Sequence, residues 1–155
     1  RRLNWKDFQN DLDINVLGAV KTIKALLPNL SSAESAGVVL FSSVGVQVGM
    51  PYHVSIRIAK GAIEGLIRSL AAELSRKNIR VNAIAPSIVD TPLANQYLGT
   101  ESKRKTVATR NPLDRVGKPD NVANMAWYLM GEKSSWITGQ IISVDGGFGT
   151  IKQPN

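Results

Sequence analysis

The chain has 155 residues, with 19 Lys and Arg against 12 Asp and Glu, one His and no Cys. This length suits a single domain, and 43% hydrophobic with 20% charged residues is typical of a globular protein. The lack of Cys excludes a disulfide scaffold, a Cys-ligated zinc site and a thiol nucleophile, and we predict no metal site. No apolar run approaches the roughly 20 residues of a membrane span, and no signal peptide opens the chain. We therefore expect a cytoplasmic protein that makes no membrane contact.

The first third of the chain predicts one helix and one strand. Apolar residues recur three and four positions apart from Trp5 to Leu27, which predicts a helix that buries one stripe, and Pro28 is expected to stop it. The run Val38–Phe41 is continuously apolar, which indicates a strand that is buried on both faces. Such a strand is expected to have a neighbour on each side.

A second helix and a second strand follow. Helical periodicity extends from about Tyr52 to Arg76, and Ile79–Ala85 predicts a strand that Pro86 ends. Several residues on the helix are small enough to let another backbone approach closely. They are Ala59, Gly61, Ala62 and Gly65.

The last third predicts a long connection, a helix and a strand. The polar stretch from Pro92 to Pro119 indicates a loop with one or two short helices. A helix over about Asp120–Met130 and a strand over Gln140–Val144 complete the chain. Alternating helices and strands favour right-handed crossovers and a parallel sheet in an α/β layer fold, here with about three strands in one domain.

More than half of the formal net charge of +7 comes from one segment, which extends from Glu101 to Lys118. We consider three interpretations: a solvated surface, a site for an anionic cofactor or substrate, and a nucleic-acid surface. No interleaved aromatic residues or known nucleic-acid motif support the third, so we expect no nucleic-acid partner. The basic residues of the segment are Lys103, Arg104, Lys105, Arg110, Arg115 and Lys118.

Five parts of the sequence, in their order and spacing, resemble the short-chain dehydrogenase/reductase family. Each part is weak alone, but together they cover nearly the whole chain. The resemblance implies a three-layer, Rossmann-like, doubly wound parallel sheet, of which this chain would form the C-terminal half. The parts are Asp13–Gly18, Phe41–Gly45, Ile56–Lys60, Arg80–Pro92, and Trp136–Gln140 with Val144–Gly147.

The resemblance also implies a reaction and its residues. Family members pass hydride between NAD or NADP and a carbonyl or alcohol carbon, and a proton must reach the developing alkoxide. By position, Asn15 corresponds to the Asn that holds a water in the proton relay, and Ser43 to the Ser that orients the substrate oxygen. Lys60 corresponds to the catalytic Lys, whose ammonium lowers the pKa of the family's Tyr and which also binds the nicotinamide ribose. Without the motif these residues would be a polar helix residue, a turn Ser and a surface Lys.

The run after the second strand corresponds to the family's nicotinamide-carboxamide contacts. Pro86, Val89 and Thr91 match that motif, whereas Ser87 replaces its Gly. A post-strand turn without a binding role is the alternative interpretation.

The family's proton donor is replaced. The family has a Tyr four residues before the Lys, where this sequence has Ile56, and Ile has no proton to donate. Tyr52 lies one helical turn earlier and cannot take the same place. His53, seven residues before Lys60, stands where a divergent enoyl-reductase branch has its Tyr. His53 is therefore a candidate proton donor, with a local hydrogen bond as the alternative.

The phosphate-binding loop of the family also has no counterpart. The glycines of residues 146–149 follow the last strand and open no helix, so they fail the context of a dinucleotide fingerprint. The chain also begins with Arg1 instead of Met. We expect residues 1–155 to be the C-terminal portion of an NAD(P)-binding Rossmann domain whose dinucleotide-binding half is absent here.

Three hypotheses for function follow. The first is an oxidoreductase of this family that acts on a small carbonyl or alcohol substrate and assembles as a homodimer or homotetramer. In it, His53, a water or the substrate itself would replace the Tyr. The second is a non-catalytic family member that serves in binding or assembly, because Ile56 replaces the proton donor. The third is an anion- or nucleic-acid-binding protein that uses the basic segment.

Overall fold

A three-stranded parallel sheet lies at the centre of the computed structural model, which describes residues 3–152. Strands β1 (Ala36–Phe41), β2 (Ile79–Pro86) and β3 (Ile141–Val144) lie in the order β1-β2-β3. The central β2 pairs with β1 from Ile79 to Ile84 and with β3 from Ala83 to Pro86. The predicted parallel sheet of about three strands is confirmed.

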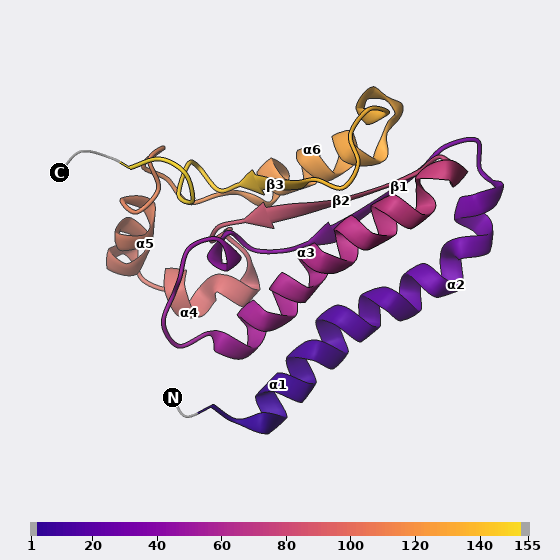
Figure 1. The fold of residues 1–155 in the computed structure, drawn as a ribbon. Helices are drawn as coiled ribbons and strands as arrows, with labels where there is room; N and C mark the ends of the chain where they lie inside the picture. The colour runs from indigo at the N-terminus through magenta and orange to yellow at the C-terminus, as the bar shows by residue number, and fades with distance from the viewer. Residues whose placement is uncertain (1–2, 153–155) are drawn as a thin grey trace.

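Helices cover both faces of this sheet (Figure 1). Helix α3 (Val54–Leu74) packs against β1 and β2 on one face, and the N-terminal helical segment lies alongside α3. Helix α6 (Pro119–Met130) covers the opposite face. The long connection before α6 contains two short helices, α4 (Asn95–Leu98) and α5 (Glu101–Ala108). The predicted three-layer α/β arrangement is therefore confirmed.

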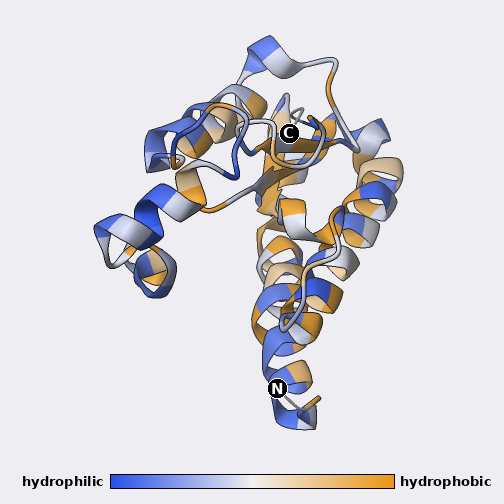
Figure 2. Cartoon of the chain, turned by 90° about the vertical axis from the view of Figure 1, so that its left-hand side faces the viewer, coloured by the Kyte–Doolittle hydropathy of each residue, from blue (hydrophilic) through white to orange (hydrophobic). Residues whose placement is uncertain are grey.

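The main core lies between α3 and the sheet. Hydrophobic colour gathers on the strands in Figure 2, as expected for a sheet that is covered by helices. Ile67 and Ala71 of α3 are buried there. The buried members of the core are Ile63, Ile67, Ala71, Leu74, Ile79, Val81 and Ala83.

The N-terminal helix differs from its prediction at two points. Helix α1 (Trp5–Leu12) continues through a π turn (Asp13–Leu17) into α2 (Gly18–Ser32), so Pro28 lies inside the helix and does not stop it. Proline removes one backbone hydrogen bond. Leu27 and Leu30 pack against the main core and hold the last turn in helical form, which overrides the proline signal.

Two predictions about the strands also need correction: the burial of β1 and the last residue of β2. β1 is only partly buried, and Phe41 is 47% exposed, because the described residues provide a neighbouring strand on the β2 side alone. Pro86 is the last residue of β2 and pairs with Val144. A proline at a strand end withdraws no donor from the middle of the ladder, so the strand extends one residue further than predicted.

Buried polar side chains on β2 fix the C-terminal part of the chain. Arg80 Nη1 donates to Leu129 O and Ser134 Oγ, both at 2.7 Å, and Nη2 donates to Met130 O at 3.3 Å and Gly131 O at 3.1 Å. These acceptors include the free carbonyls at the end of α6, where a positive charge is favourable. Arg80 therefore holds the end of α6 against the sheet.

A second buried side chain on β2 holds the turn before β3. The Asn82 amide donates to Ile137 O at 2.8 Å, and its oxygen accepts from Gln140 N at 3.0 Å. Gly139 between them has a φ of +72°, which a side chain would strain. Thus the Trp136–Gln140 motif has a structural explanation in this chain. Within residues 3–152, no helix has both the length and the apolar character that crossing a membrane requires.

Candidate active site

A cavity of about 440 Å³ opens at the carboxyl ends of β1 and β2. This is the edge at which open α/β sheets bind ligands. Ser43 follows β1, Ser87 follows β2, and both line the cavity. Residues from the start of α3 and from α4 and α5 complete the wall.

Ser43 presents a hydroxyl whose acceptor positions are filled. The residue caps a short 3-10 turn (Val44–Val46), and its Oγ accepts from Gly45 N at 3.3 Å. The same oxygen accepts from Arg57 Nη1 at 2.7 Å. A serine hydroxyl has two acceptor lone pairs and one donor. The Ser43 hydroxyl proton is therefore left to donate to a further group.

Arg57, which the motif analysis did not single out, forms one wall of the cavity. Its Nη2 contacts Met50 Sδ at 3.2 Å, a weak acceptor, and its Nε is buried without a hydrogen-bond partner within residues 3–152. Burial lowers the pKa of Arg57 from its ordinary value, and nearby Tyr97 opposes that shift in part. A Cβ on Gly45 would overlap the Arg57 guanidinium, so glycine at this position leaves the space that the guanidinium occupies.

His53 lies in the same cavity and pairs with a residue that the sequence did not suggest. It immediately precedes α3, and its Nε2 lies 2.8 Å from the hydroxyl of Tyr97 on α4. His53 Nδ1 is buried and has no partner in the described part of the chain. The pair places an imidazole and a phenol, both able to exchange protons, at the cavity wall.

Lys60 and Asn15 are not among the residues that line the cavity. Lys60 Nζ donates to Phe41 O at 2.9 Å, and burial lowers the pKa of Lys60, an effect that the Asp11 carboxylate partly offsets. The Asn15 amide donates to Asp11 O at 2.9 Å. The π turn that carries Asn15 packs against α3, which carries Lys60. Thus the structure brings Ser43 and His53 to one cavity wall, whereas it does not bring Lys60 and Asn15 to that wall.

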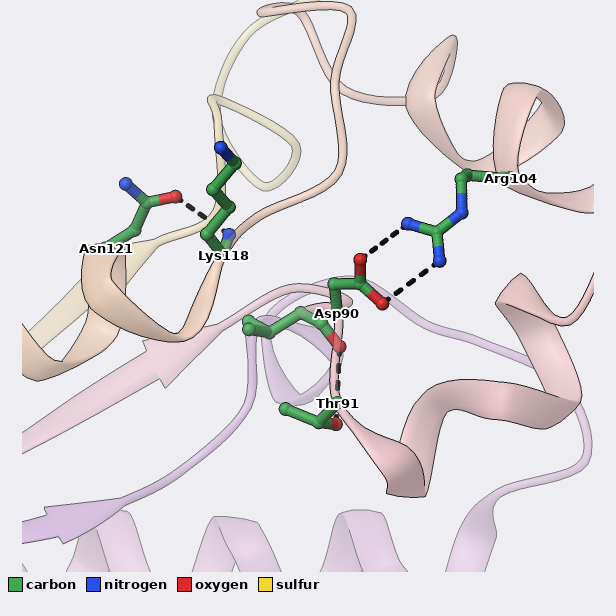
Figure 3. A network of polar contacts seen from close by, with 6 residues as sticks. Asp90, Thr91, Arg104, Lys118 and Asn121 are labelled. Atoms are coloured by element: carbon green, nitrogen blue, oxygen red, sulfur yellow. Dashed lines mark hydrogen bonds and ion pairs between the residues drawn. The ribbon is translucent and has the colours of Figure 1, made fainter. Parts of the chain in front are cut away.

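The loop after β2 carries the candidate nicotinamide contacts. Thr91 Oγ1 donates to Val89 O at 3.4 Å, and Val89 forms an isolated parallel bridge with Gly117. Asp90, between them, forms an ion pair with Arg104 at 2.6 Å (Figure 3). Hydrogen bonding to Arg104 lowers the pKa of Asp90. The bridge to Gly117 and the ion pair with Arg104 therefore hold the loop after β2 in place.

Sequence reasoning missed Arg57 and Tyr97 as cavity residues. Arg57 lies within the quoted Ile56–Lys60 motif, but nothing in the motif assigns it a contact. Tyr97 lies in the connection between Pro92 and Pro119, which shows no motif. The one sequence feature that could have pointed to Arg57 is its place directly after Ile56, the position at which the family has its Tyr.

Comparison with known proteins agrees with the fold. The family model described as enoyl-(acyl carrier protein) reductase matches residues 1–149. The 3-oxoacyl-[acyl-carrier-protein] reductase FabG of Thermotoga maritima is 33% identical over 146 residues, which are 94% of this chain and 58% of that protein. The chain spans about half the length of the curated relatives that it matches, from 46% to 62%.

Solved structures give the same result. A short-chain type dehydrogenase/reductase from Mycobacterium ulcerans has a TM-score of 0.90 at 27% identity, over 99% of this chain and 56% of that one. ElxO, solved with NADP bound, has a TM-score of 0.87 at 27% identity, over 95% of this chain and 60% of that one. The family model, the sequence relatives and the solved structures together show that the chain belongs to the short-chain dehydrogenase/reductase family.

Proposed function

We propose that the protein is an oxidoreductase that transfers hydride between a nicotinamide cofactor and a carbonyl or alcohol carbon. The observation that carries this proposal is the Ser43 hydroxyl, whose proton is free to donate because Gly45 and Arg57 fill its acceptor positions. A carbonyl oxygen becomes negative as hydride arrives at its carbon. The Arg57 guanidinium behind Ser43 strengthens the hydroxyl as a donor to that oxygen.

Lys60 on α3 and the residues that follow β2 suit the nicotinamide half of NAD or NADP. Lys60 uses one of its three N–H donors on Phe41 O, which leaves two for ribose hydroxyls. The Thr91 hydroxyl makes only a long contact with Val89 O, so it remains available to a carboxamide beside Pro86. When bound, the cofactor supplies or accepts the hydride. The NADP in ElxO supports this assignment.

We assign the proton step to Tyr97 and His53, because Ile56 stands at the family's Tyr position and has no exchangeable proton. As hydride adds to the carbonyl carbon, the π electron pair of the carbonyl moves to its oxygen. The Tyr97 hydroxyl donates its proton to that oxygen, and His53, whose Nε2 contacts the Tyr97 hydroxyl, passes a proton back to Tyr97. The 2.8 Å contact between the two side chains supports this relay.

Asn15 completes the proposed site as the residue that holds a water in the proton relay. Its π turn packs against α3, the helix that carries Arg57 and Lys60. A widened turn of this type is frequent at functional sites. The role of Asn15 is to position water, whereas Ser43 and Tyr97 contact the substrate oxygen.

A second candidate function is a binding or assembly role without catalysis. It is favoured by one observation, the alkyl side chain of Ile56 at the position of the family's proton donor. The Ile56→Tyr variant separates the two functions. Turnover by the wild-type protein supports the oxidoreductase, whereas turnover by the variant alone supports the non-catalytic function.

The homodimer or homotetramer is part of the same proposal. Gly65 faces open space on α3, and Trp136 and Trp127 are 99% and 78% exposed. Exposed aromatic residues of this size are enriched at protein interfaces. Light scattering tests the assembly, and a monomer mass would contradict it. The proposed cytoplasmic location is tested by cell fractionation.

Cofactor binding tests the oxidoreductase function most simply. We expect NADH or NADPH fluorescence to change on titration with the protein in its full native length. Lys60→Met is expected to weaken binding roughly 10-fold, the scale of a lost charge-assisted hydrogen bond, and exposed Lys24→Met serves as the matched control. Absence of binding to either cofactor would overturn the proposed function.

A further inference from the structure

The cavity that holds Ser43 is strongly cationic. Arg57 lies in its wall near α3, and Lys103 and Arg110 line it from the α5 side. Within the described residues, its lining includes no Asp or Glu. A concave site of a single charge sign focuses the electric field and attracts ligands of opposite charge.

The basic segment predicted from the sequence divides between two surfaces. Arg104 faces Asp90 and forms its ion pair outside this cavity. Lys103 and Arg110 instead line the cavity, and Lys103 Nζ donates only to the carbonyl of Gln96 at 3.2 Å among the contacts described. Two cations of the segment are therefore directed to the cavity without a carboxylate partner there.

Arg57 has the clearest shortage of acceptors. Its guanidinium carries five N–H donors, and they meet one hydroxyl and one thioether sulfur in the described chain. Neither group carries a negative charge, although burying a charge is costly without a charged or well-bonded partner. Gly45 keeps open the space against which this guanidinium lies. The fold therefore accommodates an arginine whose charge it does not neutralise.

We propose that the substrate is a carbonyl compound, or its alcohol, with an anionic group one or two atoms from the reacting carbon, and that Arg57 binds this group. The proposal rests on the oxidoreductase function above and adds the substrate class. The short spacing follows from the 2.7 Å between Arg57 Nη1 and Ser43 Oγ. Groups bound to these two side chains must lie close together. Carboxylate and phosphate both match the donor fork of arginine.

Three small probes test this substrate class by direct binding. Titration calorimetry on the native-length protein compares acetoacetate, dihydroxyacetone phosphate and methyl acetoacetate, which carry a carboxylate, a phosphate and no charge, respectively. We expect at least one anionic probe to bind 10-fold or more tightly than the neutral ester. The stronger of the two anions identifies the anionic group.

Two variants assign the preference to Arg57. Arg57→Met is expected to weaken anion binding roughly 10- to 100-fold, the range for loss of a charge-assisted hydrogen bond. The affinity for the neutral ester should not change. Gly45→Ala keeps the charge but displaces the guanidinium, and it should lower the same preference. Arg68→Met is the matched control, because Arg68 is exposed on the same helix, away from the cavity.

The outcomes separate the two proposals. Equal affinity for all three probes, no binding of any probe, or an anion preference that survives in Arg57→Met overturns the substrate class. Binding of NADH and of NADPH is measured on the same samples. Absence of binding of both cofactors, together with an Arg57-dependent anion preference, supports the anion site and contradicts the oxidoreductase function.

Discussion

Two partly or fully buried arginines, Arg80 and Arg57, differ in what surrounds their guanidinium groups. Arg80 donates to three backbone carbonyls and one hydroxyl around the end of α6. Arg57 donates to the hydroxyl of Ser43 and contacts the sulfur of Met50. Both arginines have a buried Nε without a hydrogen-bond partner among residues 3–152, but the two terminal nitrogens of Arg80 bond only to oxygens of the fold, whereas Arg57 retains terminal donors and charge at the wall of a cavity.

This difference distinguishes polar side chains that stabilise the fold from polar side chains that remain available to bind a ligand. A buried polar group that stabilises a fold has its partners within the fold. A group that binds a ligand is held in place while part of its bonding capacity stays unused. Arg57 meets the second description and Arg80 is closer to the first, although Arg80 lies on β2 and Arg57 on α3, the helix that packs against that strand.

The largest expected effect is on Arg80. Arg80→Met removes four hydrogen bonds around the end of α6 and is expected to lower the free energy of unfolding by about 3 kcal/mol, although two of the acceptor carbonyls also accept from Ser134 Oγ. Arg80→Lys, with fewer donors and no planar fork, should lose an intermediate amount. Urea denaturation measures both. If Arg80→Met lowered the free energy of unfolding by less than Arg57→Met does, the result would contradict the structural role of Arg80.

A second structural side chain, Asn82, gives a smaller loss. Asn82→Ala removes both hydrogen bonds that hold the turn before β3 and is expected to destabilise the fold by about 2 kcal/mol. Exposed Asn124→Ala on α6 is the matched control. Urea midpoints that do not differ between the two variants would contradict the structural role of Asn82.

Arg57→Met should change stability little. Its loss removes one charge-assisted hydrogen bond but also the cost of a desolvated charge, so the free energy of unfolding is expected to stay within about 1 kcal/mol of wild type. The same denaturation series measures this difference. Destabilisation as large as that of Arg80→Met would show that Arg57 is a structural residue.

The exposed pair Asp90 and Arg104 is expected to give the smallest effect, with a defined pH dependence. Arg104 holds the pKa of Asp90 below its ordinary value, so the pair stabilises the fold above that ordinary value. The contribution is lost as the pH falls through the folded-state pKa of Asp90. Asp90→Asn should therefore lower the urea midpoint slightly at neutral pH and not at all in strong acid. An equal difference at both pH values would contradict this pairing.

The sheet and its helices were predictable because local periodicity reports which face of an element is buried. The continuation of the helix through Pro28 was not, since it depends on the packing of Leu30 against residues distant in sequence. Ser43 and His53 were found through motif spacing, and the structure brings both to one cavity.

The partners of these residues could not be read from spacing alone. Arg57 meets Ser43 across 14 residues, and Tyr97 meets His53 across 44 residues. Both contacts depend on where the α3 start and α4 lie relative to the end of β1. Motifs identify a position in a family, but they do not show which side chains keep unused donors there.

The most direct test of the central claim is NADPH oxidation by the native-length protein with acetoacetate, in wild type and in Ser43→Ala. We expect turnover in the wild type and a loss of about 100-fold in the rate of the variant, the scale for removal of one donor to a developing oxyanion. NADPH binding should be the same in both proteins. Equal rates in the two proteins, or no turnover in the wild type, would contradict the claim that Ser43 and Arg57 form a site of hydride transfer.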